Sequence, residues 1–147
     1  MTDLPAIPHS PSTVLLGWRL LAHDQAKGWV RIGFEGRDEF LNPAGFVQGG
    51  FLTAMLDDCM GPAAWIMTNG ARFTATIDMN VSFLAPAKPG PLFGEGQVVQ
   101  LGGTIAFLEA RLFGPDDRML ARATSTARLV DSGAAIPRAA ASPSSRS

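Results

Sequence analysis

One stretch with helical periodicity, in a chain that otherwise shows strand and turn patterns, constrains the fold most. Apolar side chains recur at helical spacing between residues 49 and 68, namely Leu52, Met55, Leu56, Cys59, Ala63 and Ile66. This spacing predicts a single helix with one buried stripe. Pro62 lies inside the segment and cannot donate a hydrogen bond to the carbonyl of Asp58. We therefore expect a kink or a break in the helix there.

The segments that flank the predicted helix have strand-like patterns separated by short turns. The predicted strands are residues 13–23, 29–35, 73–84, 92–101, 104–113 and 118–130. Polar and apolar residues alternate through 73–84, which predicts a strand with one buried face. Short turns between the last four strands predict an antiparallel meander. A lone helix with an apolar stripe must then cover one face of the sheet, so the expected class is α+β, with about six strands.

The two ends of the chain differ from its middle. Residues 1–12 contain three prolines and little periodicity, which predicts an N-terminal arm. Residues 132–147 are rich in Ala, Ser and Pro and predict a flexible tail. The 13–131 region then forms one domain, as suits a chain of 147 residues. Within it, 36–48 is a long loop, and loops of that length are often functional.

Composition excludes several partners. The net charge of −1 leaves no basic excess for binding nucleic-acid phosphates. No apolar run reaches the ~20 residues of a membrane span, and the N-terminus lacks a signal-peptide pattern. The single cysteine, Cys59, rules out an internal disulfide framework and fits a reducing compartment. We expect a soluble cytoplasmic protein with no nucleic-acid or membrane partner.

The side chains available for catalysis are few. His9 lies in the arm and His23 at a predicted strand end, so exposed histidines are a better interpretation than catalytic ones. Cys59 lies on the buried stripe, which favours a packed thiol over a nucleophile. No Asp, His or Cys cluster has metal-ligand spacing, so we expect no metal. The carboxylates remain as candidates.

Asp57 and Asp58 fall on opposite flanks of the helix stripe. The Asp57 flank carries small residues: Gly50, Thr53, Gly61 and Ala64. The Asp58 flank carries bulky ones: Phe51, Met55, Pro62 and Trp65. Small residues let another backbone or a ligand approach closely, and partial desolvation of a carboxylate there would suit a general base. We therefore favour Asp57 and expect Asp58 to be structural or solvated. A solvated aspartate is the alternative for both.

Gln48, Gly49 and Gly50 lead directly into the predicted helix. The first N–H groups of a helix have no internal partner and carry partial positive charge. Two glycines would let a substrate oxygen reach those groups, as in an oxyanion or anion site. The alternative is that the glycines only permit the turn from loop to helix.

Two motifs together resemble the PaaI-like acyl-CoA thioesterases of the hotdog superfamily. They are N-P-x-G-x-x-Q-G-G-x-x-x-x-x-x-D at 42–57 and IDMNVSFLAPAKPG at 77–90. The resemblance covers about residues 17–130. It implies an antiparallel sheet wrapped around one long helix, an acyl-CoA substrate, and no cofactor beyond the coenzyme A of the substrate. It also implies homodimers joined edge to edge, often paired into homotetramers, with two active sites at each dimer interface.

The resemblance also implies roles for individual residues. Asp57 corresponds to the catalytic carboxylate, as a general base on water or as a nucleophile on the thioester carbonyl. The backbone N–H of Gly49 would polarise that carbonyl. Asn42 would orient the water or the carboxylate, and the hydroxyl of Thr76 would assist. In this arrangement Asp57 and Thr76 of one subunit face Asn42, Gln48 and Gly49 of the other.

Further residues are expected to bind the substrate. Gln48 and Gly50 lie at the carbonyl site. The aromatic and sulfur side chains near the motif suggest a site for an aromatic or medium-chain acyl group, with core packing as the alternative. These side chains are Phe46, Phe51, Met60, Trp65 and Phe83.

The sequence departs from the family pattern at two positions. Many members have histidine where this chain has Gln48, and glutamine cannot titrate. Many also have a basic residue where this chain has Gly103, so a contact to the coenzyme A phosphates is in question. Lys88, Arg72 and Arg111 are candidate replacements, and ordinary surface charge is the alternative for each. Two other functions stay open. One is a non-catalytic acyl-CoA-binding protein, and the other is a hotdog hydratase or dehydratase, which would need a catalytic histidine.

Overall fold

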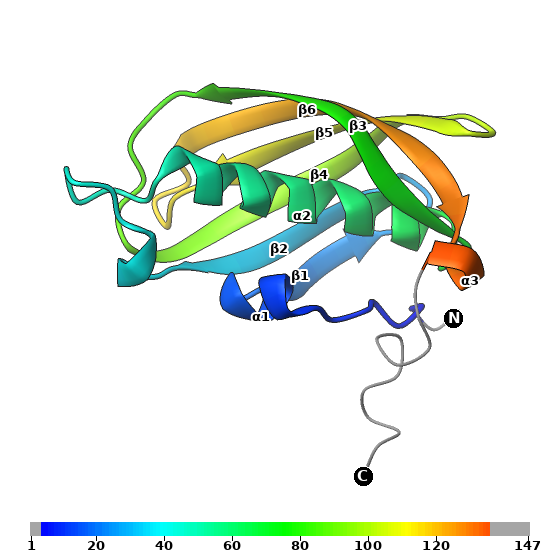
Figure 1. Cartoon of the computed structure of the whole chain (residues 1–147), viewed down its shortest axis with the longest axis horizontal. Coiled ribbons are helices and arrows are strands. Elements are labelled where there is room, and N and C mark those ends of the chain that lie inside the picture. The colour runs from blue at the N-terminus through cyan, green and yellow to red at the C-terminus, as the bar shows by residue number, and fades with distance from the viewer. Residues whose placement is uncertain (1–3, 136–147) are drawn as a thin grey trace, which may run out of the picture.

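The computed structural model of the chain describes residues 4–135, and it consists of one curved sheet around one long helix (Figure 1). Its elements in chain order are α1 (Pro11–Leu15), β1 (Arg19–Asp24), β2 (Trp29–Gly36), the 3-10 turn η1 (Asp38–Phe40), α2 (Gly49–Met67), β3 (Arg72–Phe83), β4 (Gly90–Leu101), β5 (Ile105–Phe113), β6 (Met119–Asp131) and α3 (Ser132–Ala135). The six strands form a single antiparallel sheet. The predicted α+β class is therefore confirmed.

The strand order is β1-β2-β4-β5-β6-β3, so β3 is an edge strand that pairs with β6. The predicted meander is right for β4, β5 and β6 and wrong for β3. The connection from β3 to β4 contains Pro86 and Pro89, which lack the N–H donors and the freedom that a tight hairpin needs. This connection instead contacts the loop before α2, where the N–H of Val47 donates to the carbonyl of Ala87 at 2.9 Å.

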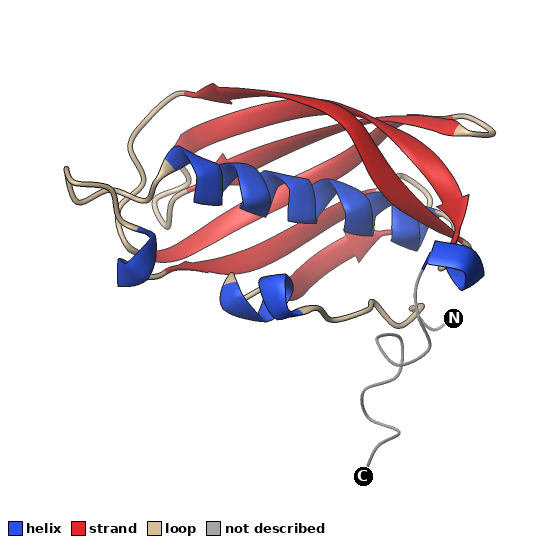
Figure 2. Ribbon diagram, viewed as in Figure 1, coloured by secondary structure: helices blue, strands red, loops and turns tan. Residues whose placement is uncertain are grey.

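Helix α2 lies across the concave face of the sheet, in front of β4 (Figure 2). All six residues of the predicted stripe are 0–3% exposed, which confirms that face of the helix as the core. The helix approaches β4 closely because Gly94 and Gly96 have no side chains. A Cβ atom on Gly96 would overlap the backbone carbonyl of Cys59.

Of the kink or break expected at Pro62, the break does not occur: α2 continues to Met67 as one helix (Figure 2). Proline has no N–H for the carbonyl of Asp58, four residues earlier. That carbonyl instead accepts a hydrogen bond of 3.0 Å from the indole Nε1 of Trp18. A side chain from the segment between α1 and β1 thus replaces the missing helix bond.

Replacing Trp18 by Phe should lower the free energy of unfolding by about 1–3 kcal/mol, because the Asp58 carbonyl loses its donor. In a Pro62→Ala background the alanine N–H can donate to the same carbonyl, so the same change should cost less. Urea unfolding of the two single variants and the double variant measures this coupling. Equal costs in both backgrounds would show that the indole bond does not compensate for the proline.

The predicted strand 13–23 is wrong at its start, where the chain forms the short helix α1. Its first turn carries a reciprocal cap. Ser10 Oγ accepts from the N–H of Thr13, and Thr13 Oγ1 accepts from the N–H of Ser10. Pro11 occupies the first helical position, where its missing N–H costs nothing. Strand β1 therefore begins only at Arg19.

The described part of the predicted N-terminal arm is residues 4–12, of which 11 and 12 belong to α1 and the segment before them packs along α2. Trp65 Nε1 donates to the carbonyl of Ala6 at 3.0 Å, and Ile7 contacts the hydrophobic core. At the other end, the first four residues of the predicted tail form α3, which Ser132 ties to the carbonyl of Gly70 at 2.8 Å. Residues 1–3 and 136–147, which complete the predicted arm and tail, lie outside the described residues.

Candidate active site

A β-bulge in β3 brings a hydroxyl group to Asp57. Thr76 pairs with Ala127 of β6 and Asp78 pairs with Thr126, so Ile77 is an extra residue between them. A bulge of this kind changes which side chains face each side of a strand. Thr76 therefore faces α2, and its Oγ1 donates to Asp57 Oδ1 at 3.1 Å. Asp57 and Thr76, which the resemblance places together in one subunit, are in direct contact.

The same bulge corrects the predicted alternation of this strand. Thr74 and Thr76 face α2 before the bulge, whereas Met79 and Val81 pack against the core after it. Ile77, expected on a single buried face, is 58% exposed. Beyond a one-residue insertion, the residues that would have faced solvent face the core and the others face solvent. The polar–apolar alternation of the sequence does not reveal such an insertion.

The small residues predicted beside Asp57 permit the close approach of β3. Gly61 lies one turn after Asp57 on α2, and a Cβ atom there would come within 3.3 Å of Thr74 Oγ1. The backbone that approaches this flank is therefore the chain's own edge strand.

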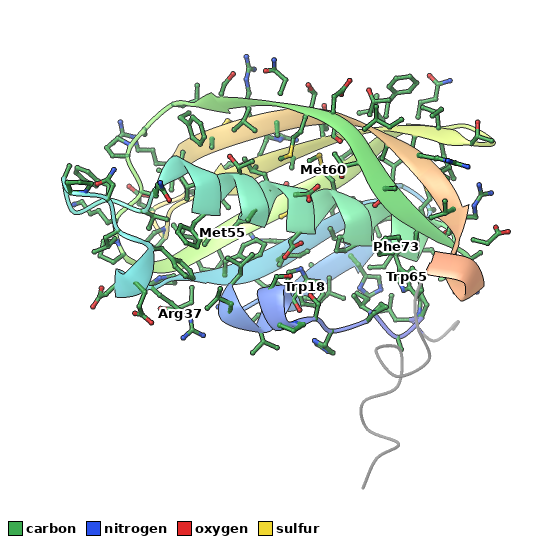
Figure 3. The ribbon with its side chains drawn as sticks, viewed as in Figure 1. Trp18, Arg37, Met55, Met60, Trp65 and Phe73 are labelled. Carbon is green, nitrogen blue, oxygen red and sulfur yellow. The ribbon has the colours of Figure 1, made fainter. Side chains whose placement is uncertain are left out.

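A cavity of about 390 Å³ runs along the same side of α2 and is called the α2 cavity below. Figure 3 shows Trp18, Trp65 and Phe73 around this side of the helix. Three parts of the chain line it: the N-terminal segment with Ile7, Pro8, His9, Ser10, Ser12, Thr13 and Trp18; helix α2 with Asp57, Asp58, Gly61, Pro62 and Trp65; and β3 with Phe73, Thr74 and Thr76. The cavity therefore joins an aromatic surface to the Asp57–Thr76 pair.

Asp58, expected to be structural or solvated, lines the α2 cavity as well and is not fully solvated. Its Oδ2 atom is buried and has no hydrogen-bond partner among the described residues. Burial and, to a smaller extent, the neighbouring Asp57 carboxylate raise the pKa of Asp58 from 3.8 to about 6. Sequence spacing placed Asp58 among the bulky side chains of its own helix. The other side of its surroundings comes from the arm and Trp18, which lie far away in sequence.

The start of α2 presents the predicted group of polar atoms. Gln48 is the N-cap residue and makes no capping hydrogen bond through its side chain. Among the described residues, the N–H groups of Gly49 and Gly50 donate to no side chain or loop carbonyl. The ring of Phe83 covers the position where a Cβ of Gly49 would lie, at 3.0 Å. Asn42 holds the preceding loop, because its Oδ1 accepts from the N–H groups of Ala44 and Phe46.

The two predicted halves of the site do not meet within one chain. Gly49 and Asp57 are eight residues apart on one helix, which corresponds to about 12 Å at 1.5 Å per residue. A single thioester carbonyl cannot contact both at that distance. Thr76 lies with Asp57, whereas Asn42 and Gln48 lie with Gly49.

The predicted acyl-binding side chains lie in different places. Met60 is 1% exposed and belongs to the core. Phe51 stacks on Phe40 with ring centroids 4.2 Å apart. Neither these two residues nor Phe46 line the α2 cavity, whereas Trp65 does. Trp18, Phe73 and Ile7, which also line it, were not predicted, since no local pattern shows that the arm folds back onto α2.

Among the basic candidates, only Arg72 is near the turn that contains Gly103. Its guanidinium donates to the carbonyls of Gly103 at 2.8 Å and Leu129 at 3.3 Å. Through these bonds Arg72 links the β4–β5 turn to β6, so its guanidinium is already used within the chain. Lys88 and Arg111 are exposed.

The other reactive side chains contribute less. Cys59 is fully buried, and burial followed by the nearby carboxylates raises the pKa of its thiol well above the usual value, which makes it a poor nucleophile. His23 is exposed, as expected. His9 is also exposed, but it lines the α2 cavity with its ring nearly perpendicular to that of Trp18, at a centroid distance of 6.3 Å. In residues 4–135 no group of three His, Cys, Asp or Glu side chains could hold a metal ion, and no helix is long and apolar enough to cross a membrane.

A curved antiparallel sheet that encloses one helix defines the hotdog class of folds. The model of the thioesterase superfamily matches residues 44–121, more than half of the chain, and the chain belongs to that superfamily. The resemblance suggested by the two motifs is thereby confirmed. Membership supports acyl-thioester hydrolysis as the general activity and makes the chain a hydrolase.

Three similar proteins illustrate the relationship. A candidate thioesterase of Ralstonia eutropha JMP134, described as related to phenylacetic acid degradation, is 32% identical, with a TM-score of 0.78 over 83% of this chain and 92% of that one. A candidate esterase of Halobacterium salinarum is 31% identical over 71% of this chain and 72% of its own length. The protein smu.793 of Streptococcus mutans UA159, solved with acetyl-CoA, shares the fold at 23% identity, with a TM-score of 0.69 over 78% of this chain and 89% of that one.

Proposed function

We propose that the protein hydrolyses acyl-CoA thioesters whose acyl group is aromatic or of medium length. One observation carries this proposal: the Asp57 carboxylate, held by Thr76, lies on the wall of a cavity that also contains Trp18, Trp65 and Phe73. An apolar cavity of about 150 Å³ can hold benzene, so about 390 Å³ has room for a larger acyl group. The acetyl-CoA bound to smu.793 supports coenzyme A as the thiol part of the substrate.

In this proposal Asp57 either activates a water molecule as a general base or attacks the thioester carbonyl as a nucleophile. The hydroxyl of Thr76 fixes one carboxylate oxygen, which leaves the other to act. The partial positive charge at the start of α2 would stabilise the oxyanion that forms on the carbonyl, through the N–H of Gly49. No metal or other cofactor is required for either route.

We further propose that the active site forms between two copies of the chain. The about 12 Å between Gly49 and Asp57 excludes a shared carbonyl within one copy. Strand β3 is an edge strand whose free side could pair with a second β3, and its residues Phe73, Ile77 and Phe83 are exposed. Such a homodimer, or a homotetramer of two dimers, would bring Asn42, Gln48 and Gly49 of one copy to the Asp57 of the other. We place this reaction in the cytoplasm, a reducing compartment that fits a chain with a single cysteine.

The test is the release of free thiol from a panel of acyl-CoA substrates by the full-length protein. We expect hydrolysis of phenylacetyl-, benzoyl- and hexanoyl-CoA to exceed that of acetyl-CoA by roughly tenfold or more in kcat/KM, because burial of each CH₂ contributes about 0.8 kcal/mol. Tight binding without thiol release would support a non-catalytic acyl-CoA-binding protein. Hydration of an enoyl-CoA would support a hydratase, although the partner of Asp57 in the structure is a hydroxyl and not a histidine.

A further inference from the structure

A second cavity, of about 630 Å³, lies on strands β3, β5 and β6, which are neighbours in the sheet (Figure 1). In β6, Arg122 stands between the buried residues Ala121 and Ala123, so its side chain points away from α2. Arg111 alternates with buried residues of β5 in the same way. This cavity, called the outer cavity below, therefore opens on the convex face of the sheet, whereas Asp57 belongs to α2 on the concave face.

Two arginines of the outer cavity repel each other. Arg111 and Arg122 lie directly opposite each other on β5 and β6, and like charges at such cross-strand positions are destabilising. Glu95 lies opposite Arg111 on its other side. Its two carboxylate oxygens are already bonded, one to Arg31 at 2.9 Å and the other to the indole of Trp29 at 3.2 Å. In the part of the chain that the structure describes, neither arginine of the outer cavity forms an ion pair. An anion held between them would remove the repulsion.

The other polar side chains of the outer cavity are also available to a ligand. They are Asn80, Ser82, Glu109 and Thr124. Ser82 lies directly opposite Arg122, next to the arginine pair. Among the described residues, the side-chain hydrogen bonds of this part of β3 and β6 are made by other residues, and none of these four side chains takes part in one. With two guanidinium groups, an amide and two hydroxyl groups, the outer cavity offers mainly hydrogen-bond donors, as an anion requires.

We propose that the outer cavity binds the phosphate group of a small phosphorylated molecule between Arg111 and Arg122. A phosphate group carries a charge of about −1.5 to −2 and three acceptor oxygens, which two guanidinium groups can share. A carboxylate has one charge and two oxygens, which a single arginine satisfies. Small-molecule sites measure roughly 300–1,000 Å³, so the outer cavity has room for more than the phosphate group itself. The site does not depend on the proposed hydrolysis, because its residues face away from Asp57.

Glu109 modifies the charge of this site. It lies two residues before Arg111 on the same face of β5, so two positive side chains and one negative side chain line the outer cavity. Its carboxylate can accept hydrogen bonds from hydroxyl groups in the rest of the ligand. The same carboxylate repels the phosphate group. Removing its charge should therefore strengthen the binding of inorganic phosphate, an effect opposite to that of removing either arginine.

The experiment is isothermal titration calorimetry of the full-length protein at low ionic strength, where charge–charge attraction is least screened. The probes are inorganic phosphate, glycerol 3-phosphate and acetate. We expect saturable binding of both phosphates and binding of acetate that is weaker by about tenfold or more. Arg111→Gln and Arg122→Gln should each weaken phosphate binding by roughly tenfold to a hundredfold, the effect of lost hydrogen bonds to a charged group. Glu109→Gln should strengthen the binding of inorganic phosphate.

Arg128→Gln is the matched control, because Arg128 is an exposed arginine on the same face of β6 that does not line the outer cavity. This variant should bind phosphate as the wild type does. Equal losses in Arg122→Gln and Arg128→Gln would show unspecific attraction to positive charge and overturn the site, as would a wild type without saturable phosphate binding.

A kinetic measurement separates this site from the hydrolytic one. Arg122→Gln should release thiol from acyl-CoA with the KM of the wild type. If its KM rises by the same factor as its Kd for phosphate, the arginines belong to the substrate site and the separate site is overturned. If the wild type releases no thiol from any substrate, the proposed function fails, while calorimetry still decides whether the outer cavity binds phosphate.

Discussion

Replacing Asp57 by Asn is expected to lower kcat on the best acyl-CoA substrate by about 10²–10⁴-fold, the usual contribution of a general acid or base. Asparagine has nearly the same shape, and its carbonyl oxygen can still accept the hydrogen bond from Thr76. The fold should therefore be kept while the carboxylate chemistry is lost. Steady-state kinetics and urea unfolding of the same preparation measure the two effects separately.

The adjacent acid provides the control for this result. Asp58 touches the same cavity but makes no hydrogen bond through Oδ2 and has no contact with Thr76 of the kind Asp57 makes. Asp58→Asn should therefore keep hydrolysis of phenylacetyl-CoA well above the level of Asp57→Asn. If Asp58→Asn loses activity and Asp57→Asn keeps it, Asp58 and not Asp57 is the catalytic carboxylate. If both variants keep full activity, neither carboxylate takes part in the reaction.

Mixing two inactive variants tests whether the site is shared between copies of the chain. Asn42→Asp keeps the acceptor oxygen that holds Ala44 and Phe46, so the loop should keep its shape. It loses the amide donor and adds a negative charge at the other half of the proposed site, so we expect it to be inactive when it is the only chain present. Unfolding and refolding it together with Asp57→Asn should restore about a quarter of wild-type activity, because about half of the dimers are mixed and each has one intact site of two. No recovery would place each complete site within one chain.

Replacing Gly96 by Ala is expected to destabilise the protein strongly, although it adds only one methyl group. The added Cβ would overlap the backbone carbonyl of Cys59, and no side-chain rotation can relieve contact with backbone. Helix α2 would have to move away from β4 along its length, which exposes part of the core. We expect a loss of at least about 3 kcal/mol, at or above the upper end of overpacking costs.

The measurement is urea unfolding, with Gly103→Ala as the matched control. No atom lies within 4 Å of a Cβ built on Gly103, so its change should stay within about 0.5 kcal/mol. The predicted loss for Gly96→Ala is a large share of the about 5–15 kcal/mol that stabilises a typical domain. If both variants unfold at the same urea concentration, the helix does not depend on the glycines of β4 for its position.

Much of the fold follows from local patterns. The helical period from Leu52 to Ile66 places one helix with one buried face, and that face is the core. The loop–helix motif that contains Asn42, Gly49 and Asp57 indicates the thioesterase superfamily, and the match over residues 44–121 confirms it. Local spacing also distinguishes the two aspartates, because small residues flank Asp57 on the helix and bulky residues flank Asp58. These features depend on contacts within a few residues, which the sequence records directly.

Other features depend on contacts between distant segments. In the sheet β3 pairs with β6, whereas the short connection predicted a hairpin between β3 and β4. The bulge at Ile77 decided that Thr76 faces Asp57.

The sequence by itself determined the helix, the acid at its small-residue flank and the glycine-rich helix start, because each is written in periodic or adjacent residues. Only the tertiary structure decided that Trp18 replaces the hydrogen bond lost at Pro62 and that the arm encloses Asp58 in a cavity. Trp18 and Asp58 are forty residues apart in the chain. Their contact exists because hydrophobic burial brings the arm onto α2, and no local pattern encodes which distant side chain fills that place.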